Sequence, residues 1–458
     1  MIKWFERDWS PQSRPSGAVG LSILALVVTL QACAATGAHP DVRGATSPAP
    51  NRADARAIYK DIAYLASDSL EGRGTGTPGN DSAAAFIARR FGMLGLQRVD
   101  TSFEQHFVAH PLVAHNESSL SLPTENVIAL LPGTDPMLRG QYVVIGAHFD
   151  HLGRSTFGAL DPDRKNVIRR GADDNASGTA AALELARLFA GSPPRRSLLF
   201  VTFSGEEMGL LGSEYFVSNS PLPLDSAVAM VNFDMVGRLR EDKLIVYGVA
   251  TATELPALLD SANAQSSGEP SSSARLWRTP LQITALGDGF GPSDHSSFYA
   301  RNIPVLHFFT DLHEDYHSAG DVVAKINATG EAHVVDVAQR VIRLIADRPA
   351  RLTFVRGAAP APVASSRRGS DVYLGSIPDM SNSGGTGLRL TGVRTGSPAE
   401  QAGIVAGDVI VEFGGKPVKD LYDFSDALYS HRPGDNVSVV VLRNGDRKQF
   451  TVRLARRG

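Results

Sequence analysis

Four short apolar segments, nearly free of polar residues, constrain the fold of this chain more than any other feature. Each has six or seven residues and is rich in Val, Ile, Leu and Phe. Segments of this kind are typical of strands that are buried on both faces, as in a mostly parallel sheet covered by helices. The four segments are residues 142–147, 197–203, 227–233 and 303–309. An Ala- and Leu-rich helix predicted over residues 177–189 separates the first two, so the order of elements indicates an α/β domain.

Further helices are predicted on both sides of these segments. A helical pattern begins near Asp54, and a Gly-rich turn follows at residues 71–79. A second helix is expected from residue 82 to about residue 94, and a third, with one apolar stripe, over residues 331–346. An Ala-, Pro-, Arg- and Ser-rich stretch then indicates an interdomain linker. We therefore predict an α/β domain over residues 54–348, a linker over residues 349–370 and a small β-rich domain over residues 371–455.

Acidic residues and histidines follow the predicted strands. Ligands of open α/β sheets bind outside the carboxyl ends of the strands, so we expect these side chains to lie together. Such carboxylates repel one another and lose hydration when buried, and divalent cations remove that penalty. Imidazole and carboxylate ligands suit zinc, with manganese or cobalt as alternatives. The segments are Gly146-Ala147-His148-Phe149-Asp150, Gly171-Ala172-Asp173-Asp174, Ser204-Gly205-Glu206-Glu207, Asn232-Phe233-Asp234 and Asp315-Tyr316-His317.

Composition argues against nucleic-acid binding and excludes sites built from several cysteines. The 458 residues include 45 Lys and Arg against 48 Asp and Glu, and this near balance gives no electrostatic footprint for nucleic acid. Cys33 is the one cysteine, so neither an intramolecular disulfide framework nor a thiolate zinc site is possible. Metal ligands must therefore come from the twelve histidines and the acidic residues.

In this order, the motifs resemble the M28 family of zinc exopeptidases, the co-catalytic aminopeptidase type. The resemblance extends over residues 58–347 and includes the turn Glu71-Gly72-Arg73-Gly74-Thr75-Gly76. It implies a two-zinc site, in which one metal is held by two side chains, the other by two more, and a fifth side chain bridges both. The implied ligands are His148 and Asp234 for one metal, Glu207 and His317 for the other, and Asp174 as the bridge.

The same resemblance implies roles for three more residues. Glu206 is the implied general base, which takes a proton from the attacking water and delivers it to the leaving amine. Asp150 would orient His148 and fix its tautomer. Tyr316 would polarise the scissile carbonyl. The implied reaction is removal of N-terminal residues from peptides with a free N-terminus.

Other interpretations remain open at this stage. The same fold supports glutaminyl cyclisation or carboxypeptidase chemistry in related proteins, although five ligands favour two metals over a single-metal cyclase. The chain can also be a non-catalytic protein that binds through its C-terminal domain. Asp173 is interpreted as a loop or helix-capping acid and His151 as structural or pocket-lining. Asp294 and His295 are interpreted as a pocket-shaping loop, because no G-x-S-x-G elbow accompanies them.

Residues 371–455 resemble a PDZ domain. The segment Gly396-Ser397-Pro398-Ala399-Glu400-Gln401-Ala402-Gly403 combines a turn, a Pro at a helix start and a Gly stop. The resemblance implies that the C-terminus of a peptide or protein is added to a sheet edge, with backbone amides near Tyr373, Leu374 and Gly375 holding its carboxylate. The alternative is a module that only braces the catalytic domain.

The N-terminus resembles a bacterial lipoprotein signal peptide. An apolar run over residues 18–30 is too short to span a bilayer but suits a signal-peptide core. It ends in Leu30-Gln31-Ala32-Cys33, which resembles a lipobox, in which Cys33 would receive the lipid. We therefore predict a signal peptide over residues 1–32 and a flexible tether over residues 33–53. The expected location is the bacterial cell envelope, lipid-anchored on the periplasmic side of the outer membrane, or alternatively secreted or periplasmic.

Overall fold

The computed structural model describes residues 52–356 and parts of the C-terminal domain. In the first range, residues 111–120, 157, 162, 265–279, 288 and 292 are not described, and in the second the described residues are 372–378, 387–393 and 396–456 without 420–422, 425–426 and 429. The predicted signal peptide, Cys33 and nearly all of the predicted tether lie outside the described residues, as does most of the predicted linker. None of the described helices is long and apolar enough to cross a membrane.

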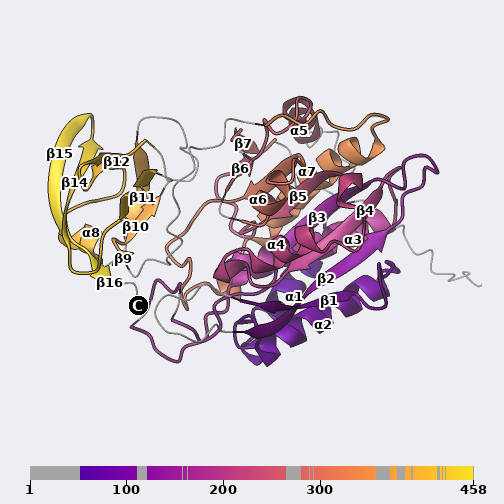
Figure 1. The fold of residues 1–458 in the computed structure, drawn as a ribbon, viewed down its shortest axis with the longest axis horizontal. Helices are drawn as coiled ribbons and strands as arrows, with labels where there is room; N and C mark the ends of the chain where they lie inside the picture. Colours follow the sequence, from indigo (N-terminus) through magenta and orange to yellow (C-terminus); the bar gives the residue numbers. More distant parts are fainter. Residues whose placement is uncertain are drawn as a thin grey trace, which may run out of the picture. The chain divides into compact units, whose positions relative to one another are not determined.

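A mixed sheet forms the centre of the first domain (Figure 1). Its described strands are arranged in the order β1-β2-β4-β3-β5-β8-β6-β7, and the central strands β4, β3, β5 and β8 are mutually parallel. The antiparallel pairs are β1 with β2, β2 with β4, and β6 with β8. The bounds are β1 Glu104–Ala109, β2 Leu122–Leu131, β3 Tyr142–His148, β4 Ser197–Phe203, β5 Ala227–Phe233, β6 Lys243–Tyr247, β7 Gln282–Ala285 and β8 Val305–Phe309.

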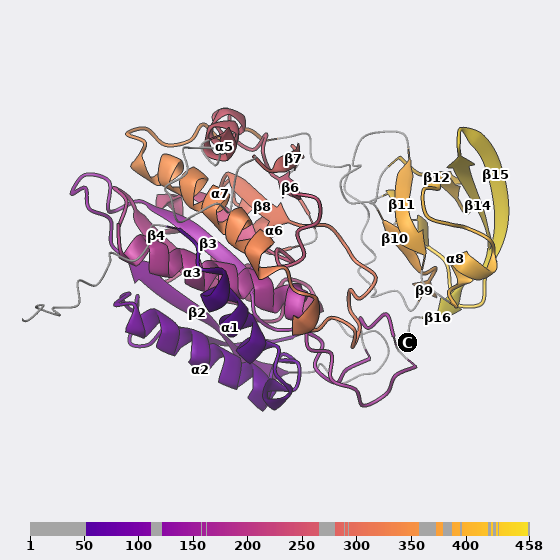
Figure 2. The same cartoon turned by 180° about the vertical axis from the view of Figure 1, so that it is seen from behind.

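Helices cover both faces of this sheet. Helices α1, α2, α3, α5 and α7 share one core with the sheet, and α1, α3 and α7 are in front of the strands in Figure 2. Helices α4 and α6 cover the other face, where Phe216 and Phe298 are fully buried. The bounds are α1 Ala55–Leu65, α2 Pro78–Met93, α3 Gly178–Ala190, α4 Leu211–Ser218, α5 Leu255–Ala264, α6 His295–Tyr299 and α7 Ala328–Asp347.

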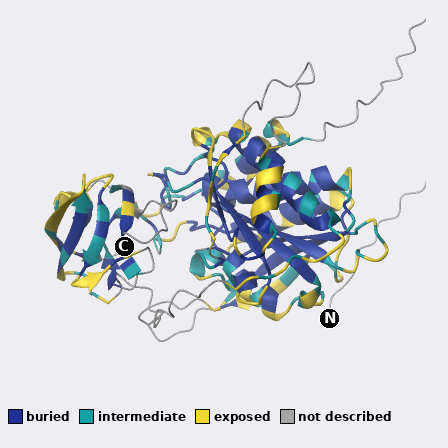
Figure 3. Ribbon diagram, turned by 90° about the horizontal axis from the view of Figure 1, so that it is seen from above, coloured by how far each residue is buried: buried dark blue, intermediate teal, exposed yellow. Residues whose placement is uncertain are grey.

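The central strands are buried from end to end, which appears in Figure 3 as dark blue ribbons through the middle of the domain. In β3, Val143 and Ile145 belong to one hydrophobic core, whereas Tyr142 and Val144 belong to the core on the opposite face. Each face therefore requires apolar residues, which explains why these segments lack polar alternation. The prediction of a mostly parallel sheet covered by helices is confirmed.

The C-terminal domain is a small antiparallel β structure with its own core, formed by residues such as Leu374, Phe413 and Val439. Its described strands pair in the order β10-β11-β12-β14-β15, with β13 on β12 and β16 on β9. Helix α8 begins after Ser397, whose hydroxyl accepts the amide of Glu400. The bounds are β9 Val372–Tyr373, β10 Ser376–Pro378, β11 Leu388–Val393, α8 Pro398–Gln401, β12 Val409–Phe413, β13 Lys416–Pro417, β14 Asn436–Arg443, β15 Asp446–Arg453 and β16 Ala455–Arg456.

Candidate metal centre

The carboxyl ends of the parallel strands bring the predicted ligands together. His148 is the last residue of β3, and Asp234 follows the last residue of β5. Asp174 lies in the turn between β3 and α3, and its peptide bond to Asn175 is cis. His317 lies in the loop after β8 with a φ of 52°. The register of the parallel strands therefore aligns ligands that are far apart in sequence.

Two clusters of potential ligand atoms result. His148, Glu206 and Asp234 form one cluster, and His151, Asp174 and Glu207 form the other; within each, one ligand atom per residue lies within 4.8 Å of the others. Asp174 faces both clusters, because its Oδ1 lies 3.4 Å from His148 Nε2 and its Oδ2 lies 3.1 Å from His317 Nε2. His317 therefore adjoins the second cluster, and Asp174 lies between the two.

The imidazoles of His148 and His317 are oriented as metal ligands are. Nδ1 of His317 lies 3.0 Å from the carbonyl oxygen of Gly158, and Nδ1 of His148 lies 3.3 Å from that of Asp150. A carbonyl only accepts, so each Nδ1 carries the proton and each Nε2 keeps a lone pair. Both lone pairs face carboxylate oxygens, which is favourable when a cation lies between them.

Buried carboxylate oxygens give a second reason to expect cations. Oδ2 of Asp174 and Oδ1 of Asp234 accept no hydrogen bond from the part of the chain that the structure describes. Leaving such buried charges without a compensating partner is strongly unfavourable. Two imidazoles and several carboxylates suit Zn²⁺, so the residues present fit two divalent cations.

Glu206 and Glu207 are adjacent but have opposite electrostatic environments. Burial raises the pKa of Glu206 well above its usual value, and Glu207 and Asp234 raise it further against the effect of His148. Burial acts on Glu207 as well, but the imidazoles of His317 and His151 hold its pKa well below the usual value. Glu207 therefore stays a carboxylate, whereas Glu206 accepts a proton readily.

Asp150 contacts His148 mainly through its backbone. Its carboxylate Oδ1 lies 3.7 Å from Nδ1 of His148, farther than its own carbonyl oxygen. The carboxylate instead accepts the hydroxyl of Thr75 at 2.8 Å and the backbone N–H of Glu206 at 3.2 Å. Asp150 thus connects the loop after β3 to the loop after β4.

Tyr316 lies against the second cluster. Its ring stacks on that of His317, with centroids 3.8 Å apart. Burial raises the pKa of Tyr316 well above its usual value, and the carboxylates of Asp174 and Glu207 raise it further. The phenol therefore keeps its proton.

His151 has a contact that the sequence does not reveal. Its Nδ1 lies 2.7 Å from Oε1 of Glu207 and 3.8 Å from Oδ2 of Asp174. With Glu207, Leu152 and Thr75, it also lines a pocket of about 250 Å³. His151 is therefore pocket-lining, as predicted, and in addition contacts a candidate ligand. The closeness of His151 to His148 in the sequence places it near the site, but only the fold brings Glu207 to it.

Asp173 belongs to neither cluster. Its Oδ1 accepts the backbone N–H of Gly237 at 2.7 Å, and its Oδ2 lies 3.2 Å from Nε2 of His313. Asp173 thus acts as a loop acid, as predicted.

Asp294 and His295 are fully buried. Burial raises the pKa of Asp294 to about 7. The ring of His295 stacks on that of His307, with centroids 4.3 Å apart.

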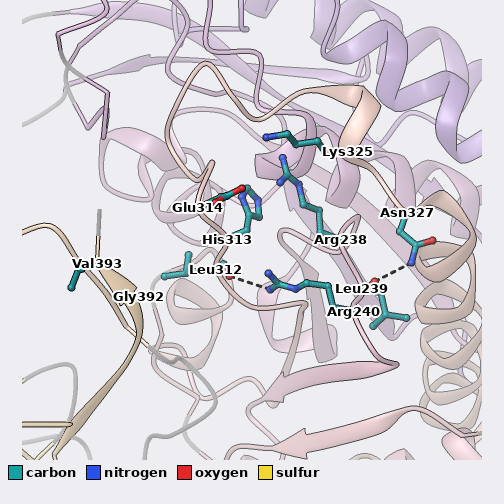
Figure 4. Close-up of a pocket in the computed structure, with 10 residues that line it drawn as sticks. All are labelled: Arg238, Leu239, Arg240, Leu312, His313, Glu314, Lys325, Asn327, Gly392 and Val393. Carbon is teal, nitrogen blue, oxygen red and sulfur yellow. Dashed lines mark hydrogen bonds between the residues drawn. The ribbon is translucent and has the colours of Figure 1, made fainter. Parts of the chain in front are cut away.

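A buried ion-pair network supports the loops that carry Asp174 and His317. Asp321 accepts the backbone N–H groups of Asp173 and Asp174 at 2.9 and 3.0 Å. Arg238 donates to Asp321 at 2.6 Å and to Asp315 at 2.7 Å. Lys325 also donates to Asp315, and in Figure 4 the side chains of Arg238 and Lys325 point toward one another. The sequence does not mark Asp321 or Arg238 as supports of the site, because charged residues in loops give no periodic signal.

In the C-terminal domain, Tyr373 is the last residue of β9, and Leu374 and Gly375 connect β9 to β10. Gly375 has a φ of 82°, and a Cβ atom there would lie 2.2 Å from Cβ of Ser397, so the turn requires glycine. Among the described strands β10 pairs only with β11, which leaves its other edge unpaired within the described sheet. Such an edge is suited to accept an extended peptide.

Comparison with known proteins agrees with these two domains. Residues 126–342 match the model of peptidase family M28, and residues 372–454 match the model of the PDZ domain. A probable zinc metalloprotease from Pyrenophora teres is 35% identical over 116 residues, or 25% of this chain and 23% of that protein. Leupeptin-inactivating enzyme 1 from Streptomyces exfoliatus is 27% identical over 294 residues, or 64% of this chain and 55% of that protein.

The fold also has a counterpart among solved structures. A Zn-dependent exopeptidase from Parabacteroides distasonis superposes with a TM-score of 0.51 at 19% identity, covering 64% of this chain and 98% of the other. The chain spans about a quarter to about half of the length of the first curated relatives that it matches. The chain therefore contains a domain of peptidase family M28, followed by a PDZ domain.

Proposed function

We propose that this protein is a two-metal exopeptidase that removes N-terminal residues from peptides. The observation that carries the proposal is the pair of adjoining clusters, in which Nε2 of His148 and Nε2 of His317 both face Asp174. His148 and Asp234 would hold one zinc ion, His317 and Glu207 the other, and Asp174 would bridge them. Manganese or cobalt could replace zinc in this ligand set.

The remaining side chains divide the chemistry between them. When bound, two divalent cations supply Lewis acidity, which polarises a carbonyl and makes water a nucleophile near neutral pH. Glu206 receives the proton of the attacking water and delivers it to the leaving amine, a role that suits its raised pKa. The Tyr316 hydroxyl keeps its proton and so can donate to the scissile carbonyl oxygen.

An assay with paired peptides tests this proposal. The protein is incubated with zinc and one peptide in three forms: free, N-acetylated and C-terminally amidated. We expect residues to be lost one by one from the N-terminus of the free and amidated forms, and no cleavage of the acetylated form. Loss of C-terminal residues would indicate a carboxypeptidase, and conversion of N-terminal Gln without hydrolysis would indicate a cyclase. Either result would contradict the proposal.

We propose further that the PDZ domain captures the C-terminus of a peptide or protein. The unpaired edge of β10 and the glycine turn at Gly375 support this role. Fluorescence anisotropy with a labelled peptide that ends in an apolar residue tests it. We expect saturable binding of the free carboxylate form and binding at least about tenfold weaker for the amidated form, as well as for Gly375→Val. Equal binding of both peptide forms would favour a bracing module.

We also propose that Cys33 carries a lipid that anchors the protein in the bacterial cell envelope. The support is the lipobox-like segment Leu30-Gln31-Ala32-Cys33 after an apolar run. Metabolic labelling with palmitate in a bacterial host tests it. Label in the natural protein and its loss in Cys33→Ser are expected. An unlabelled protein released into the periplasm or medium would instead indicate ordinary secretion.

A further inference from the structure

The turn at residues 71–77 precedes the residues that match the M28 family model, yet it contacts the candidate metal centre. Two of its side chains, those of Arg73 and Thr75, are buried against loops that carry candidate ligands. We infer that Thr75 is a positioning residue. Its hydroxyl holds the carboxylate of Asp150 next to His148, and this carboxylate in turn holds the backbone N–H of Glu206. This inference rests on the proposed function only where it concerns the base Glu206.

The hydroxyl of Thr75 completes the hydrogen bonding of Asp150. It donates to Oδ2 of Asp150 at 2.8 Å, while Oδ1 accepts the backbone N–H of Glu206 at 3.2 Å. Thr75 is 4% exposed and Asp150 is fully buried, so this hydrogen bond is shielded from bulk solvent. One carboxylate therefore joins three segments: the turn, the loop after β3 and the loop after β4.

Arg73 fixes the backbone of the same loops. Its buried guanidinium donates to the carbonyl oxygens of Phe149 at 2.7 Å, Gly171 at 2.9 Å and Leu65 at 2.5 Å. Phe149 separates His148 from Asp150, and Gly171 begins the turn that leads to Asp174. Arg73 therefore fixes the backbone of these loops, and Thr75 adds a hydrogen bond to the side chain of Asp150.

The glycine at position 72 lets the turn approach this closely. Gly72 has a φ of 75°, and a Cβ atom there would lie 2.1 Å from the carbonyl oxygen of Arg169. Backbone bonds also connect the turn to the β3 loop, from His151 N–H to the Arg73 oxygen and from Gly153 N–H to the Gly72 oxygen. Gly72 is thus required by its close packing against the backbone of Arg169.

Without the hydroxyl, one oxygen of a buried carboxylate loses its donor. Asp150 is then free to turn its Oδ2 toward other donors, which displaces the N–H of Glu206 or the ring of His148. Residues that support metal ligands in this way typically change metal affinity or activity by about 10- to 100-fold when they are replaced. Thr75→Val keeps the shape of the side chain and removes only the hydroxyl, whereas Thr75→Ser keeps the hydroxyl.

The test compares the full-length protein with these two variants in two measurements. Zinc affinity is measured by competition with a chromophoric chelator, and kcat and KM are measured with an amino-acid amide. We expect Thr75→Val to lower kcat, or the affinity for the more weakly held zinc, at least tenfold, with KM within about twofold. Thr75→Ser should restore the affected quantity to within about threefold of the natural protein.

Two results would overturn the inference: both quantities within twofold of the natural values in Thr75→Val, or losses in Thr75→Ser as large as in Thr75→Val. Circular dichroism of both variants verifies that they fold; if Thr75→Val is unfolded, Thr75→Ala beside Thr75→Ser is compared on the same criteria. If the natural protein hydrolyses no amide, the proposed function fails, but the zinc affinities still decide the role of Thr75.

Discussion

Nε2 of His317 lies 3.0 Å from Oε2 of Glu207, although one residue follows β8 and the other follows β4. Strands β3 and β5 lie between these two strands in the sheet. The contact exists because both loops leave the same edge of a parallel sheet and turn toward Asp174. The assignment of two metals and one base depends on this convergence.

Glu206→Gln separates the role of a base from that of a ligand. We expect kcat to fall by about 10²- to 10⁴-fold, because an amide cannot take a proton from water. Bound zinc, measured by mass spectrometry of the metal, should remain near two ions per chain. Loss of one ion together with activity would show instead that Glu206 is a ligand, as its place in the His148 cluster permits.

Glu207→Gln is the matched control for that variant. It changes the neighbouring residue in the same way, but it removes the charge from a carboxylate that contacts His317 and His151. We expect the second zinc ion to be lost or bound at least about tenfold more weakly. Retention of two tightly bound ions would contradict the ligand role of Glu207.

His151 should contribute to the second metal site through its bond with Glu207. Its Nδ1 lies 2.7 Å from Oε1, which leaves Oε2 to face His317. His151→Ala should weaken zinc binding by about tenfold or more, whereas His151→Asn, whose amide can replace Nδ1 as a donor, should retain most of it. Isothermal titration with zinc measures both variants, and equal losses in the two would refute the hydrogen-bonding role.

Arg238→Met should destabilise the first domain. Arg238 is buried and donates to both Asp315 and Asp321, so its removal leaves two carboxylates without their shared partner. Breaking a buried pair in this way costs about 3–5 kcal/mol of unfolding free energy. Urea unfolding of the chelator-treated protein measures the loss. Lys243→Met, which removes an exposed ion pair with Glu241, should leave the transition unchanged. An unchanged transition in Arg238→Met would refute the stabilising role of the buried ion-pair network.

Asp408 should make the stability of the PDZ domain depend on acid pH. Burial raises its pKa, but the hydrogen bonds from Arg443 outweigh that effect and hold it below the usual value. The stabilisation is complete above the unfolded pKa of about 4 and is lost as the pH falls through the lower folded value. Asp408→Asn should lower the unfolding free energy at pH 7 by about 1.5–3 kcal/mol. Hydrogen exchange of the β14 amides measures this, and the natural protein should lose more protection than the variant between pH 5 and pH 3. Parallel losses in both would contradict the assignment.

The central strands were predictable because burial on both faces leaves a continuous apolar run. The prediction for residues 197–203 and 227–233 coincides with β4 and β5. The helix predicted over residues 331–346 differs from α7 by three residues at its start and one at its end. Helix α2 begins four residues earlier than predicted, since Thr77 caps it and Pro78 occupies its first turn. The capping signal was present, but the Gly-rich composition of the turn concealed it.

The remaining elements could not be found in the same way. Strand β2 contains Pro123, Glu125 and Asn126, which interrupt its apolar pattern. The amide of Asn126 donates to the carbonyl oxygen of Gly212, a partner that only the fold supplies. The candidate ligands were predictable from motifs at strand ends, together with the family resemblance that these motifs carry. The residues that hold these ligand loops by hydrogen bonds, including Thr75 and Asp321, were not predictable. A hydrogen bond between distant loops leaves no local pattern in the sequence.

The two-metal site is tested most directly by a zinc titration of metal-free protein, with hydrolysis of a free-amine peptide measured at each step. We predict no turnover without metal, full turnover at about two zinc ions per chain, and no turnover at any zinc concentration for the N-acetylated peptide. Full turnover in the metal-free protein, or in one that binds no more than one ion, would contradict the two-metal site.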